Sequence, residues 1–220
     1  MSNELSDLPP DFTLRLSAAK LLVSAARDGG SKVELANALK ELGNIERRPS
    51  QLRDDADRSY AEAAALYLEL EMPLEAAWII RHIGINHEYA ERFDEAEKYY
   101  DESLALFRKY ADEDDTNYPN TVRYPAVIKN RVGKRDESSA LWEEAVRRYD
   151  KMGQPAGVAE GSAWLTIFAI EKGNLVLAGQ WFAKAKAAAS AARDGDTDKW
   201  IAEVGAQLNK ALGDAERQNS

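Results

Sequence analysis

Two histidines, His82 and His87, are the side chains best suited to bind a metal or to act as acid–base groups. Five residues apart on a helix, their side chains point about 140° from each other. They therefore do not form the i, i+4 pair that binds zinc on one helical face. The chain has no cysteine, which excludes a disulfide, a thiolate metal site and a cysteine nucleophile. We expect no metal site.

The acidic segment 111–118, Ala-Asp-Glu-Asp-Asp-Thr-Asn-Tyr, gathers four carboxylates. It lacks the alternating oxygen ligands and the central glycine of a helix–loop–helix calcium site, so we interpret it as a solvated loop. The sequence also contains no nucleophile elbow, phosphate-binding glycine loop or dinucleotide fingerprint. We therefore expect no catalytic residues and no cofactor, and the chain is predicted not to be an enzyme.

The charge and hydropathy of the chain exclude two classes of partner. Its 38 acidic and 29 basic residues give a net charge of −9, which would repel a nucleic-acid backbone. The acidic N-terminus lacks the basic start and apolar run of a secretory signal, and no stretch approaches 18 apolar residues. We expect a cytoplasmic protein with neither a nucleic acid nor a membrane as its partner.

The elements that must position any site repeat along the chain. A small residue, an aromatic residue and a small residue stand at i, i+4 and i+7, and the pattern returns after 40, 42 and 40 residues. Its members are Ala56, Tyr60 and Ala63; Ala96, Tyr100 and Ser103; Ser138, Trp142 and Ala145; and Ala178, Phe182 and Ala185. Such a stripe is one face of a helix, and its period predicts one structural unit used four times.

A helix is predicted before each striped helix, and a bulky residue followed by a small one marks it. These pairs are Leu42-Gly43, Ile83-Gly84, Pro125-Ala126 and Leu165-Thr166. The small residue lets the neighbouring backbone come close at a helix crossing. Pro125 predicts that its helix either kinks or begins late. Asp54, Asp94 and Asp136 are expected to accept bonds from the first-turn amides of the striped helices and to suit the positive end of the helix dipole.

The second unit carries the clearest family pattern, Ile83-Gly84 followed by Phe93-Asp94-Glu95-Ala96, Tyr100 and Ser103-Leu104. With Gly133 and Gly173 at tight turns, the chain resembles the tetratricopeptide repeat (TPR) family over about residues 35–192. The resemblance implies an all-α fold, a right-handed α-solenoid of antiparallel helix pairs. The period is longer than the usual 34 residues of the family, the first turn holds an extra residue near Pro49-Ser50, and no proline closes each unit.

We expect a single TPR-like domain over residues 11–212. Terminal repeats expose an apolar face, so capping helices are predicted at both ends. The expected segments are a capping helix at 11–28, repeats at about 35–70, 76–110, 119–152 and 159–192, a second capping helix at 197–212, and disordered ends at 1–10 and 213–220.

The resemblance also implies a ligand surface, because first helices line the concave side of TPR proteins and bind extended peptides there. Position by position, that surface holds six basic and three acidic residues. The residues expected to bind a ligand are Lys40, Asn44, Trp78, Arg81, Tyr89, Asn120, Arg123, Asn130 and Arg131. Arginines would supply charge, asparagines would bond peptide amides, and Trp78 and Tyr89 would contact side chains. The predicted function is a protein-interaction module that binds an extended acidic peptide in a basic groove.

Three alternatives stay open. Some TPR proteins clamp a C-terminal carboxylate, and Lys40 and Asn44 match the first two clamp positions, whereas His82, Asn120 and Tyr124 replace the other three. The second alternative is a regulatory sensor whose groove binds a small anionic ligand or a signalling peptide. The third alternative is a structural homodimer, joined through the terminal helices or the face 183–192.

Overall fold

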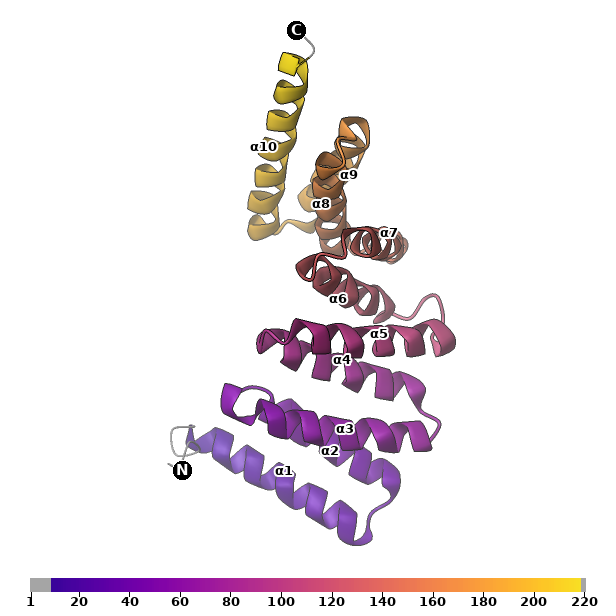
Figure 1. Cartoon of the computed structure of the whole chain (residues 1–220). Coiled ribbons are helices and arrows are strands. Elements are labelled where there is room, and N and C mark those ends of the chain that lie inside the picture. Colours follow the sequence, from indigo (N-terminus) through magenta and orange to yellow (C-terminus); the bar gives the residue numbers. More distant parts are fainter. Residues whose placement is uncertain (1–8, 219–220) are drawn as a thin grey trace. The chain divides into compact units, whose positions relative to one another are not determined.

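The computed structural model describes residues 9–218, and within that range every regular element is a helix. The expected all-α class is therefore confirmed. The chain divides into two compact units, Met1–Ala111 and Asp112–Ser220, which we call unit 1 and unit 2. Each unit is a series of antiparallel helices joined by short turns (Figure 1).

Unit 1 contains one flanking helix and two helix pairs. Its elements are α1 (Pro10–Gly29), α2 (Lys32–Glu46), the short 3₁₀ helix η1 (Ser50–Leu52), α3 (Arg53–Glu69), α4 (Pro73–Tyr89) and α5 (Phe93–Tyr110). Helix α2 packs on α3 and α4 packs on α5, while α1 covers α2 and α4 covers α3. Each helix therefore lies beside its neighbour in sequence, as repeat stacking requires.

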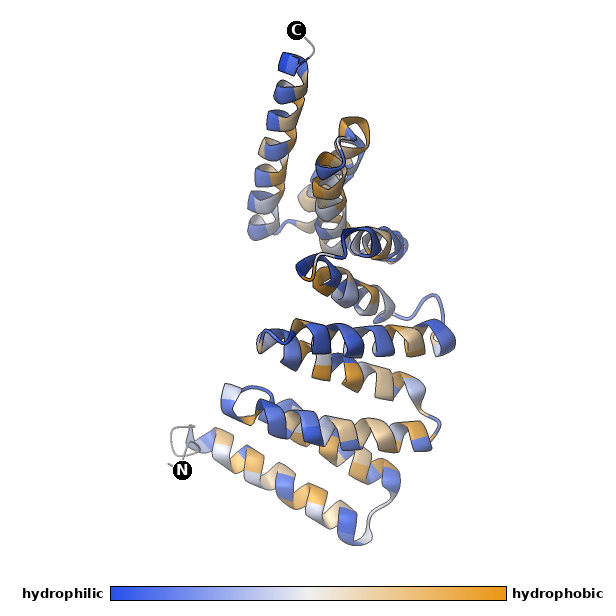
Figure 2. Ribbon diagram, in the orientation of Figure 1, coloured by the Kyte–Doolittle hydropathy of each residue, from blue (hydrophilic) through white to orange (hydrophobic). Residues whose placement is uncertain are grey.

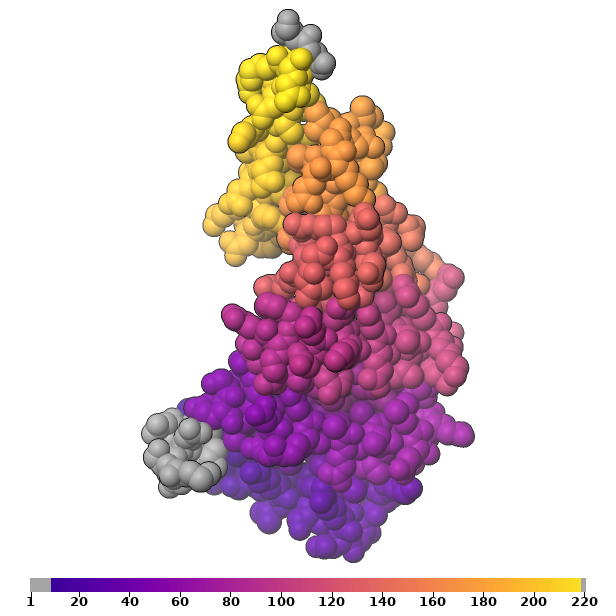
Figure 3. All heavy atoms as spheres, viewed as in Figure 1, coloured from indigo at the N-terminus to yellow at the C-terminus, as the bar shows by residue number. Residues whose placement is uncertain are grey.

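Unit 2 repeats this arrangement and ends in a long helix. Its elements are α6 (Tyr118–Arg131), α7 (Arg135–Lys151), α8 (Pro155–Glu171), α9 (Leu175–Ala192) and α10 (Gly195–Gln218). Helix α10, yellow in Figure 3, packs against both α8 and α9. It continues through residues 213–218, so the predicted disordered tail is wrong for that segment; Arg217 pairs there with Asp214 at 2.6 Å. Residues 1–8 and 219–220 of the predicted disordered ends lie outside the described range.

The predicted stripes form the cores of the helix pairs. Eleven of the twelve stripe residues are fully buried, and Phe182 is half-buried. Glycine on the first helix makes this packing fit: a Cβ added to Gly43 would lie 2.6 Å from the Tyr60 ring, and one added to Gly84 would lie 2.7 Å from the Tyr100 ring. The small residues therefore let each aromatic ring lie directly on the partner backbone. Polar residues cover much of the outer surface of α3 and α5 (Figure 2).

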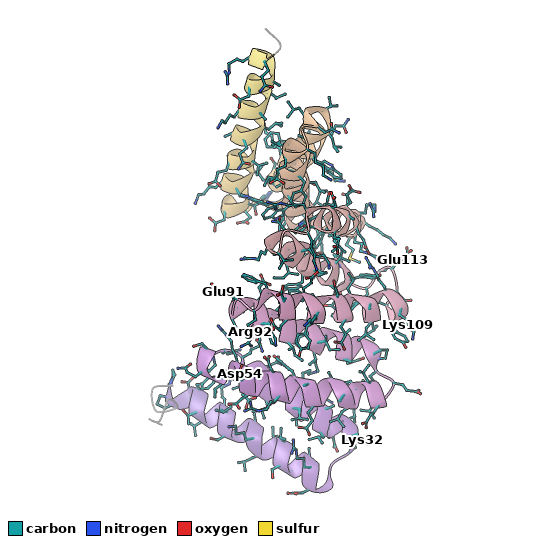
Figure 4. All side chains as sticks on the ribbon, viewed as in Figure 1. Lys32, Asp54, Glu91, Arg92, Lys109 and Glu113 are labelled. Carbon is teal, nitrogen blue, oxygen red and sulfur yellow. The ribbon has the colours of Figure 1, made fainter. Side chains whose placement is uncertain are left out.

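Five tight turns between consecutive helices share one hydrogen-bond pattern. In each turn one residue has a positive φ: Glu71, Glu91, Gly133, Gly153 or Gly173. The amide after that residue donates to a carbonyl five residues back, for example from Arg92 to His87 at 2.9 Å. This is the Schellman arrangement, which satisfies the last carbonyls of a helix. Glu91 lies in the turn between α4 and α5 (Figure 4).

The helix starts contradict one part of each of two predictions: the side-chain caps are absent, and the helix that contains Pro125 does not begin late. Asp54, Asp94 and Asp136 are the second residues of α3, α5 and α7, and none of these helices has a side-chain cap. The aspartates do lie in the first turn, where a negative charge suits the helix dipole, as predicted. Helix α6 does not begin late: it starts at Tyr118, and Pro125 lies buried inside it.

A polar cluster joins the two helix pairs of unit 1. Asp57 on α3 accepts a hydrogen bond of 2.7 Å from Asn86 on α4 and lies 3.5 Å from His87. Arg92 lies 3.6 Å from both Asp57 and Asp54, and Figure 4 shows Arg92 and Asp54 facing each other. Burial raises the pKa of Asp57 and lowers the pKa of His87. We interpret this cluster as a structural joint.

Candidate ligand-binding surfaces

In unit 1 the first helices α2 and α4 meet around His82. The ring of His82 lies 4.0 Å from the ring of Trp78, and its Nδ1 lies 3.4 Å from a guanidinium nitrogen of Arg47. Burial, together with the charges of Arg47 and Arg81, lowers the pKa of His82 to about 3. The imidazole is therefore neutral at physiological pH, and its Nδ1 accepts a bond from Arg47.

The residues predicted to bind a ligand in unit 1 are not equally accessible. Arg81 is only 7% exposed, so the structure places it in the interior rather than on the expected surface. Its burial follows from its position on α4, whose 81–86 segment packs on both neighbouring helices. Lys40 and Trp78 are half-buried. Tyr89 is exposed, and the guanidinium of Arg53 lies 5.4 Å from its ring centre.

Tyrosines of the second helices hold asparagines of the first helices in place. The Tyr60 hydroxyl donates to Oδ1 of Asn44 at 2.9 Å. The Tyr149 hydroxyl donates to Oδ1 of Asn120 at 2.7 Å, and Tyr67 does the same to Asn37 at 2.6 Å. The NH₂ group of Asn44 donates to Oε1 of Glu41 at 3.3 Å, whereas Asn37 and Asn120 are exposed. With their amide oxygens occupied, Asn37 and Asn120 are placed to donate to a carbonyl or a carboxylate.

Unit 2 contains a cavity of about 910 Å³ on the side of its first helices. Its walls come from α6, the end of α7, α8 and the segment that joins α9 to α10. The lining residues are Asn120, Arg123, Tyr149, Gln154, Pro155, Ala156, Gly157, Glu160, Trp164, Ala192, Asp194, Asp196, Thr197 and Trp200. This volume lies in the range of pockets that enclose a ligand of drug size.

Arg123 and Glu160 form a bidentate pair in the cavity wall. Nε of Arg123 lies 2.6 Å from one carboxylate oxygen of Glu160, and a terminal nitrogen lies 2.7 Å from the other. Although burial opposes it, the bonds to Glu160 raise the pKa of Arg123 above its usual value. The predicted charge of Arg123 is thus neutralised inside the protein, because two planar groups of opposite charge are matched edge to edge.

Asp194 and Asp196 lie in the part of the cavity wall where α10 begins. Asp194 accepts bonds from the Thr197 hydroxyl at 2.5 Å and from the amides of Asp196 and Thr197, both at 3.3 Å. These bonds, that of the Thr197 hydroxyl first, lower the pKa of Asp194, so it is ionised at neutral pH. Trp200, one turn further along α10, lies 5.6 Å from Trp164 of α8, ring centre to ring centre.

The structure therefore brings together only two of the predicted unit 2 residues, Asn120 and Arg123. Asn130 accepts a bond from Arg135 at the far end of α6, and Arg131 is exposed; neither lines the cavity. Sequence reasoning missed that residues of α8, the end of α9 and the beginning of α10 line one cavity. Trp164 and Trp200 carried a signal, because both are aromatic residues outside the repeated stripe.

Two kinds of feature are absent from residues 9–218. No helix in this range is long and apolar enough to cross a membrane. The same residues contain no group of three or more histidine, cysteine, aspartate or glutamate side chains that could hold a metal ion.

Comparisons with known proteins give the fold but no relative in sequence. No protein-family model and no curated protein matches the chain. The crystal structure of BtubC (BKLC) from P. vanneervenii superposes with a TM-score of 0.73 at 19% identity, covering 94% of this chain and 86% of that one.

Two further crystal structures have similar folds. A putative kinesin light chain from Podosopora anserina with TPR-like repeats gives a TM-score of 0.64 at 12% identity, over 83% of this chain and 90% of that one. A STAND signal-transduction ATPase from Pyrococcus horikoshii with a TPR sensor gives 0.55 at 12% identity, over 94% of this chain and 38% of that one. The predicted resemblance to TPR proteins is confirmed at the level of the fold.

Proposed function

We propose that this chain, a TPR-like helical repeat protein, is a protein-interaction module that binds extended peptide segments on the surfaces of its first helices. The observation that carries the proposal is the unit 2 cavity. It opens among α6, α8 and α10, and its lining combines apolar rings with a few polar groups. This mixture is typical of sites that recognise a ligand by shape and by a small number of directed hydrogen bonds.

The oriented asparagines support a peptide as the ligand. An extended peptide presents carbonyl oxygens along its length, and it needs donors fixed at the protein surface. Asn120 in unit 2 and Asn37 in unit 1 are exposed and have their oxygens bonded to tyrosines, so their NH₂ groups would meet such carbonyls without rearranging.

The preference for an acidic peptide remains a proposal for unit 1 only. Lys40 lies on α2 one turn before Asn44, and Arg47 caps the C-terminal end of the same helix one turn after it; both are half-buried. An acidic side chain beside Asn44 would meet these two cations. Arg81 has no such role, because it is buried.

Blocking the cavity tests the proposal. Ala156 is exposed and lines the cavity, so Ala156→Arg would fill it without disturbing the core. We expect peptides selected from a random display library against the intact chain to lose at least about tenfold in affinity for this variant. The control is Ala140→Arg, an equally exposed alanine on α7 outside the cavity. A library that yields no binder, or binders indifferent to both substitutions, would refute the proposal.

A homodimer is a second candidate, favoured by the outer face of α1. Leu14 and Leu21 are each 71% exposed and Leu22 is 62% exposed, and the apolar colour along α1 is visible in Figure 2. Leucines seven residues apart lie on one face of a helix, and exposed apolar stripes commonly mark protein contacts. Light scattering on Leu14→Glu/Leu21→Glu tests this: a dimer that becomes a monomer supports it, whereas a monomeric parent protein excludes it.

A further inference from the structure

The lining of the unit 2 cavity has an excess of negative charge. It includes the carboxylates of Glu160, Asp194 and Asp196 and one cation, Arg123. Glu160 and Arg123 cancel each other through their bidentate pair. Asp196 also lies 3.4 Å from Lys199, but both side chains of that pair are more than three-quarters exposed, so the contact neutralises little. The two aspartates at the start of α10 thus leave the cavity negative.

Aromatic rings form the other part of the lining. Trp164 and Trp200 lie 5.6 Å apart at an angle of 58°, and Tyr149 lies in the same wall with its hydroxyl bonded to Asn120. The face of an indole ring carries partial negative charge and attracts cations. Rings and carboxylates that converge on one space favour the same kind of ligand group, a positively charged one.

We propose that the unit 2 cavity binds a basic side chain, the guanidinium or ammonium group of an arginine or lysine, from a segment of a partner protein. The charged group lies against the ring of Trp164 or Trp200 on the cavity side and faces Asp194 and Asp196. The NH₂ group of Asn120 bonds a backbone carbonyl of the same segment. This inference rests on the proposed peptide-binding function, and it gives the ligand of unit 2 the opposite charge to the one that the sequence predicted.

An acidic ligand fits this cavity poorly. To bind a carboxylate, Arg123 would have to release Glu160, which would leave a partly buried carboxylate without its partner. The incoming charge would also face Asp194 and Asp196. A basic ligand requires no such rearrangement, because the Arg123–Glu160 pair stays intact and serves as a rigid wall.

Fluorine NMR of the full chain labelled with 5-fluorotryptophan can test the charge preference. The chain has five tryptophans, so each resonance can be assigned with one Trp→Phe variant. The probes are blocked pentapeptides of glycine and serine with arginine, citrulline or glutamate at the centre. We expect the arginine peptide to shift the Trp164 and Trp200 resonances and to leave that of Trp142, which is fully buried elsewhere, unchanged. Citrulline has the same shape without the charge and should bind about tenfold more weakly.

Two variants on one helix turn separate the site from the general charge of the protein. Asp194→Asn/Asp196→Asn removes the excess negative charge, while Asn at position 194 can still cap α10. We expect this variant to bind the arginine peptide at least about tenfold more weakly. The matched control is Asp198→Asn, in the first turn of the same helix but outside the cavity, which should bind as the parent does.

The outcomes distinguish this inference from the proposed function. If the glutamate peptide shifts Trp164 and Trp200 more than the arginine peptide does, the charge assignment is overturned while peptide binding stands. Equal binding of arginine and citrulline peptides, or equal losses in the Asp198→Asn control, would also overturn it. If library-selected peptides fail to bind the parent chain, the proposed function itself fails.

Discussion

Alanine in place of Gly84 tests the close contact between a first helix and the aromatic residue of its partner. The added Cβ would lie 2.7 Å from two carbons of the Tyr100 ring. Carbon atoms in contact prefer a separation of at least ~3.5 Å, so the ring or the helix would have to move by roughly 0.8 Å. The ring is fully buried, and its hydroxyl is fixed to Glu88 at 2.7 Å, so it has little room to retreat.

The magnitude follows from two opposing effects. Replacing glycine by alanine within a helix stabilises it by about 1 kcal/mol, whereas overpacking a core costs about 1–3 kcal/mol. Gly179 provides the control, because it lies inside α9 with no atom within 4 Å of an added Cβ. We therefore expect Gly179→Ala to stabilise unit 2 by about 1 kcal/mol. The change in the free energy of unfolding that Gly84→Ala causes in unit 1 should be about 1–3 kcal/mol less favourable than the change that Gly179→Ala causes in unit 2.

Urea unfolding followed by circular dichroism measures both variants, with the two units fitted separately if their transitions differ. Equal stabilisation by Gly84→Ala and Gly179→Ala would refute the close packing. Adding Tyr100→Leu completes a double-mutant cycle, since a smaller side chain removes the clash. A coupling energy near zero in that cycle would likewise contradict the contact between Gly84 and Tyr100.

Two further predictions concern turns and pH. Glu91 has a φ of 57°, so Glu91→Gly should raise the free energy of unfolding by about 0.5–1 kcal/mol, and Gly173→Ala, at a φ of 72°, should lower it by a similar amount in urea melts. The folded pKa of His82, about 3, lies below the unfolded value of 6.5. Between these values the unfolded chain binds a proton that the folded chain does not, so stability falls as pH falls below 6.5. The contribution of His82 to this loss should approach ~1.4 kcal/mol per pH unit, so the fall in stability between pH 7.5 and 5.5 should be smaller in His82→Gln, which retains only the contributions of other groups such as His87. Parallel pH profiles of parent and variant would contradict the buried neutral histidine.

The repeated helices were predictable because burial selects residues with the period of the helix. Tyr60, Tyr100 and Trp142 lie at corresponding points of three helices, and no other regular structure places such stripes on one face. The positive φ of Glu71 and Glu91 was not predictable, because a glutamate gives no signal for that conformation. The position of the aspartates after the helix starts was missed for a similar reason, since aspartate suits both the cap and the first turn.

The site was less predictable than the fold because it depends on distances between helices. The sequence placed Arg123 on the predicted ligand surface, but it did not show that a carboxylate oxygen of Glu160 lies 2.6 Å from its Nε. Trp200 lies outside the four repeats, so no repeat register could relate it to Trp164. Sequence patterns fix which face a residue occupies, whereas the charge offered to a ligand depends on which neighbours meet across that face.

The tyrosine–asparagine bonds make recognition sensitive to substitutions in the core. Tyr60 and Tyr149 pack in the interior, yet their hydroxyls decide which way Asn44 and Asn120 turn. A change from tyrosine to phenylalanine keeps the ring and loses one hydrogen bond, worth about 0.5–1.5 kcal/mol, yet it frees the asparagine amide to flip. A substitution in the core would thus alter how a surface asparagine is presented to a partner, without changing that asparagine.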